Sequence, residues 1–348
     1  MEQSAYYVMD NLDIHWNIST PRLFGNGKSR VLAIDPLASD CHYRGKYGIL
    51  SQRTFNNLCL SRSAGCSSVW ITGSDVSCLR AAHRLDLPIL LGHHYHHNDG
   101  LSSLIRWKLF YELLAKVNVR VTYPTDFTRN EALKISPWLT GISDVVKYHF
   151  PIHNISTHDK AAAKIKLGID PHSFVLGNAG WLIKRKRWDV FLETCSLVKS
   201  LVPSSRFIIC GGGPLMNYLK EYAHSLNLSD SVIFTGWLED LSICYTALDV
   251  ILFNSDYDAL GRTPGEAMGY GAVPVASVRY GGISELIVNN LNGFLYDKHD
   301  PSLLAETVRR IATSDRLLED LREAAKTTLR THYSSLSAIS FYDDFFNS

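Results

Sequence analysis

Short apolar runs alternate with amphipathic stretches throughout the second half of the chain. Runs such as 206–210 and 250–253 are rich in Val, Ile and Phe, which predicts buried strands. Between them, apolar residues recur every three or four positions, which predicts helices packed on those strands. The expected strands are 174–177, 206–210, 232–234, 250–253, 273–276 and 293–296. The expected helices are 188–202, 218–226, 241–248, one from about 284, and long helices within 303–331. This alternation predicts a parallel, doubly wound α/β sheet.

The first half of the chain shows a similar but less regular pattern. The expected strands are 31–34, 69–71, 89–91 and 119–122, with helices at 50–60 and 103–117, whereas residues 1–28 fit no strand–helix unit. A polar stretch that begins with Pro151 separates the halves, and a last apolar stripe of Ile339, Tyr342 and Phe346 predicts a terminal helix. We therefore expect two domains, 1–152 and 153–334, with helix 335–348 packing back on the first domain.

Composition narrows the class of protein. The 348 residues are 46% apolar and 20% charged with a net charge of +1, which is typical of a soluble enzyme and gives no reason to expect a nucleic-acid partner. The seven cysteines are scattered without a C-x-x-C pair, which favours reduced thiols. No signal peptide and no apolar run of about 20 residues is visible. These features predict a cytoplasmic protein and leave open peripheral contact with the inner face of a membrane.

The most informative segment runs from Asp258 to Met268 and follows an apolar strand. Thr263, Pro264 and Glu266 have the residue types of an N-cap, a first helical position and the acid of a capping box. A loop carboxylate and a carboxylate in a first helical turn are thus expected at the carboxyl end of a strand, where open α/β sheets bind ligands. The alternative interpretation is structural: Glu266 completes the capping box and Asp258 is a turn residue.

Two further loops are expected at the same edge of the sheet. The loop from Gly180 to Arg187 carries four cations just before a helix, where backbone N–H groups already favour an anion. A solvated basic loop is the alternative. The turn of Gly211, Gly212, Gly213 and Pro214 allows close approach of a ligand, although ordinary turn chemistry explains it equally. No G-x-G-x-x-G follows, which disfavours a dinucleotide-dependent dehydrogenase.

Taken in order, these motifs resemble those of the retaining GT-B glycosyltransferases of family 4, the glycosyl transferases group 1. The pair Asp258-x7-Glu266 is similar to the E-x7-E signature of that family, and 180–186 to its G-R-L-x-x-x-K segment. The agreement continues in a turn (211–214), a loop (281–285) and two strands (232–236 and 292–295). The first half matches only loosely. The resemblance implies α/β GT-B architecture: two Rossmann-like doubly wound parallel-sheet domains facing an inter-domain cleft, the first on the acceptor side and the second binding a nucleotide-sugar donor.

The resemblance also implies roles for single residues. Glu266 is expected to hold the ribose hydroxyls of the donor, Asp258 to lie at the donor sugar and diphosphate, and Lys186 to bind the diphosphate. The backbone of Leu260 and Gly261 is expected to meet sugar hydroxyls. The remaining expected donor-binding residues are Gly180, Arg185, Gly212, Gly213, Arg262 and Thr263.

The chain departs from the family pattern at three places. Asp258 is one methylene shorter than the usual Glu, and Ala259 and Leu260 stand where Gly-Phe is common. Trp181 replaces an Arg that usually shares the diphosphate, for which Arg185 or Arg187 is a candidate substitute.

The first half contributes two weaker signals. The segment 93–99 holds four histidines and one aspartate, which suggests a metal, but in an extended run neighbouring histidines point to opposite faces. The resemblance favours instead a catalytic His94 that reaches the transferred sugar, and a strand-end histidine bonded to loops is the alternative. The loop with Arg44, Gly45 and Lys46 resembles the family's acceptor-side loop, or is an ordinary strand–helix connection.

The helix expected near 101–119 carries cations beside aromatic residues. It fits an amphipathic helix that lies on an acidic membrane. A helix that packs its apolar residues into the core is the favoured interpretation.

The predicted function is a hexosyltransferase-type glycosyltransferase that moves a sugar from a nucleotide diphosphate to an acceptor hydroxyl with retention. A UDP- or GDP-sugar is the expected donor, and the absence of D-x-D from the donor half favours a metal-independent reaction without cofactor. The expected acceptor is a saccharide, a lipid-linked glycan or a small molecule, in polysaccharide or glycoconjugate biosynthesis. Two alternatives stay open: a non-catalytic nucleotide-sugar binding subunit, and a GT-B sugar-nucleotide epimerase.

Overall fold

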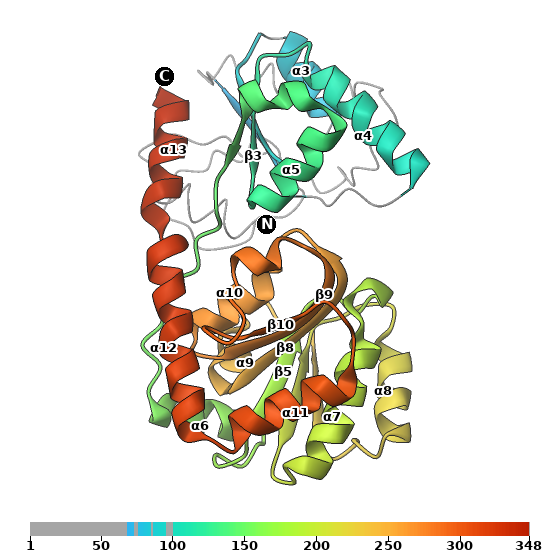
Figure 1. The fold of residues 1–348 in the computed structure, drawn as a ribbon, viewed down its shortest axis with the longest axis vertical. Helices are drawn as coiled ribbons and strands as arrows, with labels where there is room; N and C mark the ends of the chain where they lie inside the picture. The colour runs from blue at the N-terminus through green and yellow to red at the C-terminus, as the bar shows by residue number, and fades with distance from the viewer. Residues whose placement is uncertain (1–67, 73–75, 85, 95–99, 348) are drawn as a thin grey trace. The chain divides into compact units, whose positions relative to one another are not determined.

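The computed structural model describes residues 68–72, 76–84, 86–94 and 100–347. The chain forms two compact units, which we call the N-terminal unit (Met1–His149 with Ser335–Ser348) and the C-terminal unit (Phe150–Ser334). Each unit is built on its own parallel sheet flanked by helices (Figure 1).

The C-terminal unit contains a six-stranded sheet of order β10-β9-β8-β5-β6-β7, and all its strand pairs are parallel. The chain enters at the central strand β5, builds outward to β7, and then returns to add β8 on the other side of β5. The switch point therefore lies between β5 and β8. The strands are β5 (Val175–Ala179), β6 (Arg206–Cys210), β7 (Val232–Gly236), β8 (Val250–Asp258), β9 (Val273–Gly281) and β10 (Phe294–Tyr296).

Side chains alternate between the two faces of this sheet, as the period of a strand requires. Leu176, Phe207 and Leu252 belong to a core formed with α7, α8 and α11, whereas Ile208 and Ile251 belong to a second core formed with α6 and α9. The continuous apolar runs of the sequence thus reflect burial on both faces. The helices are α6 (Thr157–Lys166), α7 (Trp188–Leu201), α8 (Met216–Ser225), α9 (Ser242–Ala247), α10 (Arg262–Gly269), α11 (Pro301–Ala312) and α12 (Asp315–His332).

Two local predictions in this unit are wrong. The helix expected from about residue 284 is a single 3-10 turn, η4 (Gly282–Glu285). The strand expected at 250–253 runs on to Asp258, because β8 pairs with β9 from Val250 opposite Val273 to Asp258 opposite Gly281. Asp258 therefore ends a strand and does not lie on a free loop.

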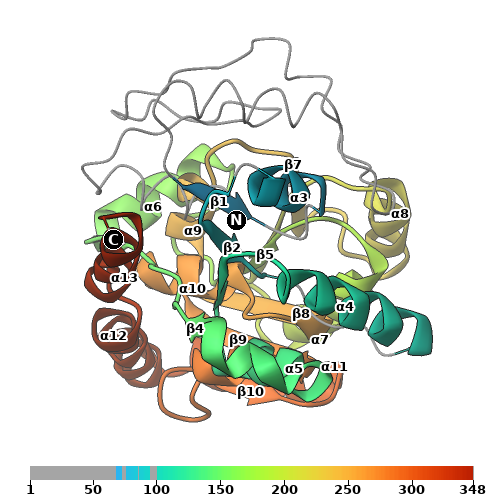
Figure 2. The same cartoon turned by 90° about the horizontal axis from the view of Figure 1, so that it is seen from above.

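The N-terminal unit contains a four-stranded parallel sheet among the described residues, of order β1-β2-β3-β4. Its elements are β1 (Val69–Thr72), α3 (Val76–Arg84), β2 (Ile89–Gly92), α4 (Leu101–Leu114), β3 (Val119–Tyr123), α5 (Asp126–Ile135), η2 (Pro137–Ile142) and β4 (Ser143–Val145), and Figure 2 shows them from above. The strand predicted at 31–34 and the helix predicted at 50–60 lie outside the described residues.

The C-terminal helix α13 (Ser335–Asn347) belongs to the N-terminal unit. Ala338 and Tyr342 pack against Leu90 of β2, and the ring of Tyr342 lies 4.8 Å from that of Trp70. The apolar stripe of this helix thus covers the face of β2 that carries Leu90. Within the part of the chain that the structure describes, no helix combines the length and apolarity needed to span a bilayer.

Candidate functional site

The candidate site lies at the carboxyl ends of β5 and β8, on either side of the switch point. The two strands are paired at Leu176 with Val250 and at Gly177 with Ile251, and β8 then continues along β9. The basic loop follows β5, and Asp258 ends β8. Strand order thus brings together two segments that lie about 70 residues apart in sequence, as expected for a ligand site of an open α/β sheet.

Two cations of the basic loop converge on Asp258. Lys186 Nζ donates to Asp258 Oδ2 at 2.5 Å, and Arg185 Nη1 donates to the same oxygen at 3.1 Å. The exposed fractions of the three side chains are 16% for Asp258, 15% for Lys186 and 30% for Arg185. The group is therefore largely desolvated and carries one more positive charge than negative charge.

The pKa shifts follow from this arrangement. Burial raises the pKa of Asp258, but Lys186 and Arg185 outweigh it, so the net shift is downward and the carboxyl is ionised at neutral pH. Burial lowers the pKa of Lys186, and Asp258 opposes that shift by stabilising the ammonium. An anion placed beside these cations would restore a local balance of charge.

Aromatic side chains and a strained turn hold the two cations in place. Lys186 Nζ lies 4.4 Å from the ring centroid of Phe253, and the Arg185 guanidinium lies 4.9 Å from that of Tyr257 while donating to Tyr257 O at 2.7 Å. The turn ends at Arg187, which adopts a left-handed conformation with φ 43°. Since this conformation is unfavourable for a non-glycine residue, the surrounding contacts must maintain it.

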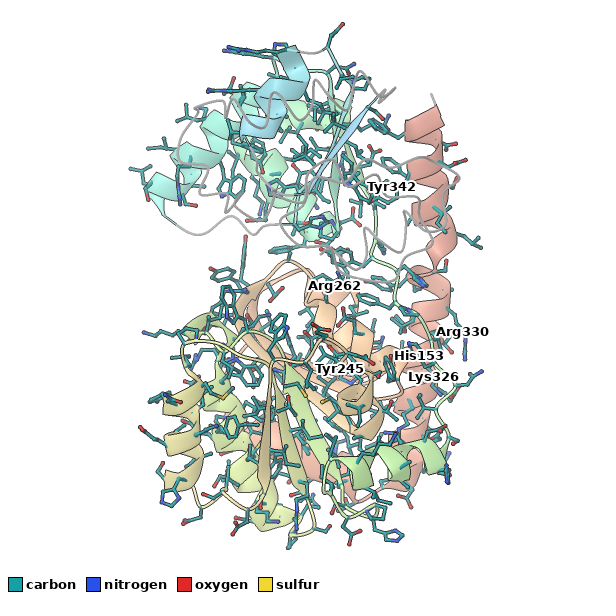
Figure 3. The ribbon with its side chains drawn as sticks, turned by 180° about the vertical axis from the view of Figure 1, so that it is seen from behind. His153, Tyr245, Arg262, Lys326, Arg330 and Tyr342 are labelled. Carbon is teal, nitrogen blue, oxygen red and sulfur yellow. The ribbon has the colours of Figure 1, made fainter. Side chains whose placement is uncertain are left out.

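Glu266 lies in the second turn of α10 and is held by two side chains. Tyr245 Oη of α9 donates to Glu266 Oε2 at 2.9 Å, and Arg262 Nη2 donates to Oε1 at 2.9 Å. Tyr245 and Arg262 are labelled in Figure 3. The Glu266 side chain is 22% exposed, so its carboxylate is partly accessible.

The predicted capping box at α10 is wrong. The N-cap is Gly261 with φ 78°, a conformation that glycine adopts without strain. Thr263 lies inside the helix and its hydroxyl donates to Ala179 O of β5 at 3.2 Å. Glu266 therefore completes no capping box, and within its helix it is bonded to the Arg262 side chain. Asp258 Oδ1 also accepts from Gly261 N at 3.2 Å, so Asp258 both shapes this turn and pairs with the cations.

The glycine turn after β6 packs against the basic loop. A Cβ at Gly211 would lie 1.9 Å from Gly180 O, and a Cβ at Gly213 would lie 2.6 Å from Leu182 O. Both glycines are thus required by the close approach of the two backbones. A Cβ at Gly212 would meet its nearest neighbour at 3.8 Å, so packing within the chain does not require glycine there. Approach of a ligand would explain it.

Two exposed tryptophans flank this turn. Trp181 follows Gly180 and is 62% exposed, and Trp237 follows β7 and is 69% exposed. Trp237 adjoins Gly212, and Trp181 adjoins Gly213. Trp181 was expected only as a replacement for Arg, and Trp237 was not expected at the site, although a large aromatic residue directly after a strand end was a usable signal.

The histidines after β2 have distinct surroundings. His93 is fully buried, and its Nε2 lies 3.2 Å from Tyr111 Oη. His94 is partly buried, and its Nδ1 lies 2.8 Å from Tyr148 Oη, with the two rings stacked. His94 belongs to the N-terminal unit, and its catalytic role stays a prediction.

Several predicted features lie outside the described residues. They include the acceptor-side loop of Arg44, Gly45 and Lys46, and also His96, His97 and Asp99. Among the residues that are described, no group of three or more His, Cys, Asp or Glu side chains is placed to hold a metal ion.

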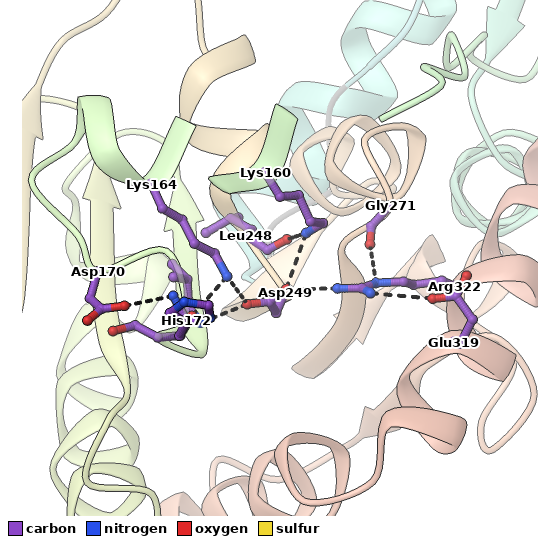
Figure 4. Close-up of polar contacts among 11 residues, drawn as sticks. Lys160, Lys164, Asp170, His172, Leu248, Asp249, Gly271, Glu319 and Arg322 are labelled. Atoms are coloured by element: carbon purple, nitrogen blue, oxygen red, sulfur yellow. Dashed lines mark hydrogen bonds and ion pairs between the residues drawn. The ribbon is translucent and has the colours of Figure 1, made fainter. Parts of the chain in front are cut away.

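A second charged cluster lies at the opposite end of β8, around Asp249 (Figure 4). Lys164 Nζ donates to Asp249 Oδ2 at 2.9 Å, and Arg322 Nη2 donates to Oδ1 at 2.8 Å. Lys160 lies 3.3 Å from Oδ1, and Val175 N donates to Oδ2 at 3.0 Å. The sequence did not predict this cluster, whose members come from β5, α6, α12 and the residue before β8.

A family comparison shows what the C-terminal unit is similar to. The family described as glycosyl transferases group 1 matches residues 159–328, which lie within the C-terminal unit. This segment contains the basic loop, the glycine turn, Asp258 and Glu266. The match covers just under half of the chain, so it shows the family that this segment is similar to.

Two curated glycosyltransferases are similar to parts of the chain. The chain is similar to 2-deoxystreptamine N-acetyl-D-glucosaminyltransferase of Niallia circulans, with 26% identity over 195 residues that cover 56% of this chain and 49% of the relative. It is also similar to UDP-Gal:alpha-D-GlcNAc-diphosphoundecaprenol alpha-1,3-galactosyltransferase of Escherichia coli, with 26% identity over 219 residues, 62% of this chain and 54% of the relative. The chain thus spans about half the length of these relatives.

Solved structures establish the fold. Anabaena Alr3699/HepE in complex with UDP and glucose superimposes with a TM-score of 0.75 at 17% identity, over 84% of this chain and 80% of that one. A TarM variant of S. aureus, in complex with fondaparinux, alpha-GlcNAc-glycerol and UDP, gives a TM-score of 0.64 at 21% identity. The superposition covers 75% of this chain and 51% of that chain. The predicted GT-B fold class, with two parallel-sheet α/β domains, is confirmed.

Proposed function

We propose that the protein is a retaining, metal-independent hexosyltransferase of family 4, which transfers a sugar from a nucleoside-diphosphate sugar to an acceptor hydroxyl. The observation that carries the proposal is the convergence of Lys186 and Arg185 on Asp258 at the switch point of the sheet, with Glu266 on the adjoining helix. A UDP- or GDP-sugar is the proposed donor. The proposed acceptor is a saccharide, a lipid-linked glycan or a small molecule, and no cofactor is required.

The reaction needs stabilisation of the leaving group. The bond from the anomeric carbon to the diphosphate breaks, and a bond from that carbon to the acceptor oxygen forms, while the acceptor proton passes to the departing phosphate oxygen. The transition state has oxocarbenium character on the sugar and negative charge on the diphosphate. Lys186 and Arg185 are already held in a desolvated site, so they can stabilise that charge without reorganisation.

The other site residues bind different parts of the donor. Glu266 accepts hydrogen bonds from the ribose hydroxyls, with Tyr245 and Arg262 fixing its orientation. Asp258 and the backbone of Leu260 and Gly261 orient the transferred sugar. The amide of Gly212, where packing leaves room for a ligand, contacts the diphosphate. His94 keeps the proposed catalytic role that the family resemblance implies.

A donor screen tests the assignment. UDP-, GDP-, ADP- and CMP-sugars are tested for an upward shift in melting temperature, and transfer is measured with the donor that binds. Lys186→Ala is expected to lower kcat by about 100- to 1,000-fold, the range for loss of one transition-state donor. Lys184→Ala, which removes an exposed charge from the same loop, is the matched control and should keep nearly full activity. Equal losses in the two variants, or no response to any donor, would refute the proposal.

Product analysis separates the alternatives. Proton NMR of the product should show the anomeric configuration of the donor, and activity should persist in a chelator. A binding subunit would bind the donor without transfer. An epimerase would convert the sugar nucleotide in the absence of an acceptor.

A further inference from the structure

Helix α10, which carries Glu266, has two glycines on one face. Gly265 and Gly269 are four residues apart, so they lie one above the other on the same side of the helix. Glycine is unfavourable in a helix, and neither of these two residues adopts a positive φ. A left-handed conformation therefore does not account for them. The close approach of another segment does.

That segment runs from Phe150 to His153. A Cβ at Gly265 would lie 2.5 Å from the Cε2 and Cζ ring atoms of Phe150, which is 1% exposed. A Cβ at Gly269 would lie 2.2 Å from Pro151 O, and His153 N donates to Gly269 O at 2.9 Å. The two glycines thus form a groove, which we call the α10 groove, and the segment packs into it.

Phe150 is also held by Tyr333, the residue that follows α12. Phe150 N donates to Tyr333 O at 3.3 Å, and the two rings lie 5.6 Å apart. Tyr333 Oη in turn donates to Glu285 O at 2.8 Å. Phe150 is the first residue of the C-terminal unit, and Tyr333 directly precedes its last residue, Ser334. The α10 groove is therefore in contact with both ends of this unit.

Glu266 is connected to the groove in two ways. Gly265 directly precedes it in the helix. Tyr270 follows the helix, and its ring lies 4.0 Å from that of His153 and 5.7 Å from that of Tyr245. Tyr245 Oη donates to Glu266 Oε2 at 2.9 Å, and Figure 3 labels both His153 and Tyr245. A shift of the segment in the groove would therefore change the position of the Glu266 carboxylate.

We propose that Phe150 is a positioning residue for the nucleotide: its ring, packed in the α10 groove, sets the position of Glu266 and thereby the affinity for the ribose of a nucleoside diphosphate. The inference rests on the proposed function, in which Glu266 accepts hydrogen bonds from the ribose hydroxyls. Such bonds depend steeply on distance and angle, so a small shift of the carboxylate weakens them. Inorganic pyrophosphate has no ribose, so its binding to Lys186 and Arg185 should not depend on Phe150.

An exchange of side-chain size between Phe150 and Gly265 tests the proposal in the full chain. Titration calorimetry measures the affinities for UDP, GDP and inorganic pyrophosphate. Gly265→Ala places a methyl group against the Phe150 ring and should weaken nucleoside diphosphate binding about tenfold, the effect of about one lost hydrogen bond, without changing pyrophosphate binding. Phe150→Leu lacks the ring atoms that would clash. The double variant Gly265→Ala, Phe150→Leu should therefore recover most of the wild-type affinity.

Two further variants separate positioning from a general loss of stability. Phe207→Leu makes an equal change in the core between the sheet and α7. It should lower the melting temperature and leave all three affinities at their wild-type values. In a Glu266→Gln background, Gly265→Ala should weaken nucleoside diphosphate binding no further, because the carboxylate that it displaces is already absent.

The possible outcomes distinguish this inference from the proposed function. Wild-type affinities in Gly265→Ala, an equal loss for pyrophosphate, or a double variant no better than Gly265→Ala would overturn the inference alone. A wild type that binds neither UDP nor GDP would reject the proposed donor and the inference with it. If Gly265→Ala did not fold, Phe150→Leu would decide, because its partly empty groove should weaken nucleoside diphosphate binding and spare pyrophosphate binding.

Discussion

Strand β8 has a largely buried carboxylate at each end, and the cations around the two acids make different further contacts. Asp249 precedes the strand and is 9% exposed, whereas Asp258 ends it and is 16% exposed. Both are surrounded by cations, and in both the net pKa shift is downward because those cations outweigh burial. Burial and charge alone would treat the two clusters as equivalent.

The difference lies in what else the cations contact. Around Asp249, Lys160 also donates to Leu248 O, Lys164 to Ser173 O at 2.8 Å, and Arg322 to Gly271 O at 3.0 Å. Each cation therefore has a fixed backbone acceptor besides the shared acid. These contacts tie α6 and α12 to the amino ends of the strands, which indicates a structural role.

Around Asp258 the cations come from one short loop. Lys186 donates to Asp258 and lies over an aromatic ring, which adds no hydrogen-bond acceptor of full strength. An incoming diphosphate could therefore share this lysine with Asp258 at little cost. A buried ion pair is thus informative about function only when its partners and its place in the sheet are both considered.

The largest expected effect is that of Asp249→Asn on stability. The change leaves three cations without their shared acid, and breaking a buried ion pair typically costs about 3–5 kcal/mol. Chemical denaturation at pH 7 should show this loss, with the slope against denaturant unchanged. A loss below about 1 kcal/mol would mean that the backbone acceptors alone hold the cations.

The lowered pKa of Asp249 also predicts how the stability of the wild type depends on pH. The folded-state pKa of Asp249 lies below its ordinary value near 4, so its contribution is complete above about pH 4 and is lost as pH falls through the lowered folded-state pKa. Asp249→Asn should flatten the stability profile in that acid range. If the variant lost stability with falling pH as steeply as wild type does, other carboxyl groups would account for the acid dependence.

The next effect is that of Asp258→Asn, for which we expect a smaller loss of about 1–3 kcal/mol, because Arg185 keeps its backbone acceptor Tyr257 O and only Lys186 loses its charged acceptor. The variant should also bind inorganic pyrophosphate about tenfold more tightly than wild type, since the acid no longer competes for the cations. Melting curves against pyrophosphate concentration measure this through mass action. Asp249→Asn is the control, and its pyrophosphate response should equal that of wild type.

The sequence predicted the strands of the C-terminal unit and the loops of the site because both depend on local patterns. Alternating apolar runs specified β5 to β10, and loop composition placed Lys186 and Glu266 at one edge. The extension of β8 to Asp258 was missed because it depends on pairing with β9, which local propensity does not encode.

Other features depended on contacts between distant segments. The residue types predicted Thr263 as the N-cap, but the N-cap is Gly261. The threonine hydroxyl donates to Ala179 O of β5 and does not cap a helix N–H. Tyr245 reaches Glu266 from 21 residues away. Such contacts can be predicted only when the sheet order is known. The same holds for Asp249 and the cations around it.

The smallest expected effect concerns Asp256, which lies on the same strand between the two buried acids. It is 37% exposed and pairs with Arg187 at 3.4 Å and with His299 at 3.3 Å. Exposed ion pairs contribute about 1 kcal/mol or less, so Asp256→Asn should change the free energy of unfolding by no more than that. Its response to pyrophosphate should equal that of wild type, because neither Lys186 nor Arg185 contacts this acid. Asp256 helps to hold the left-handed turn at Arg187. If Asp256→Asn lowered the free energy of unfolding as much as Asp258→Asn does, that turn would stabilise the site at least as strongly as the direct contacts of Asp258.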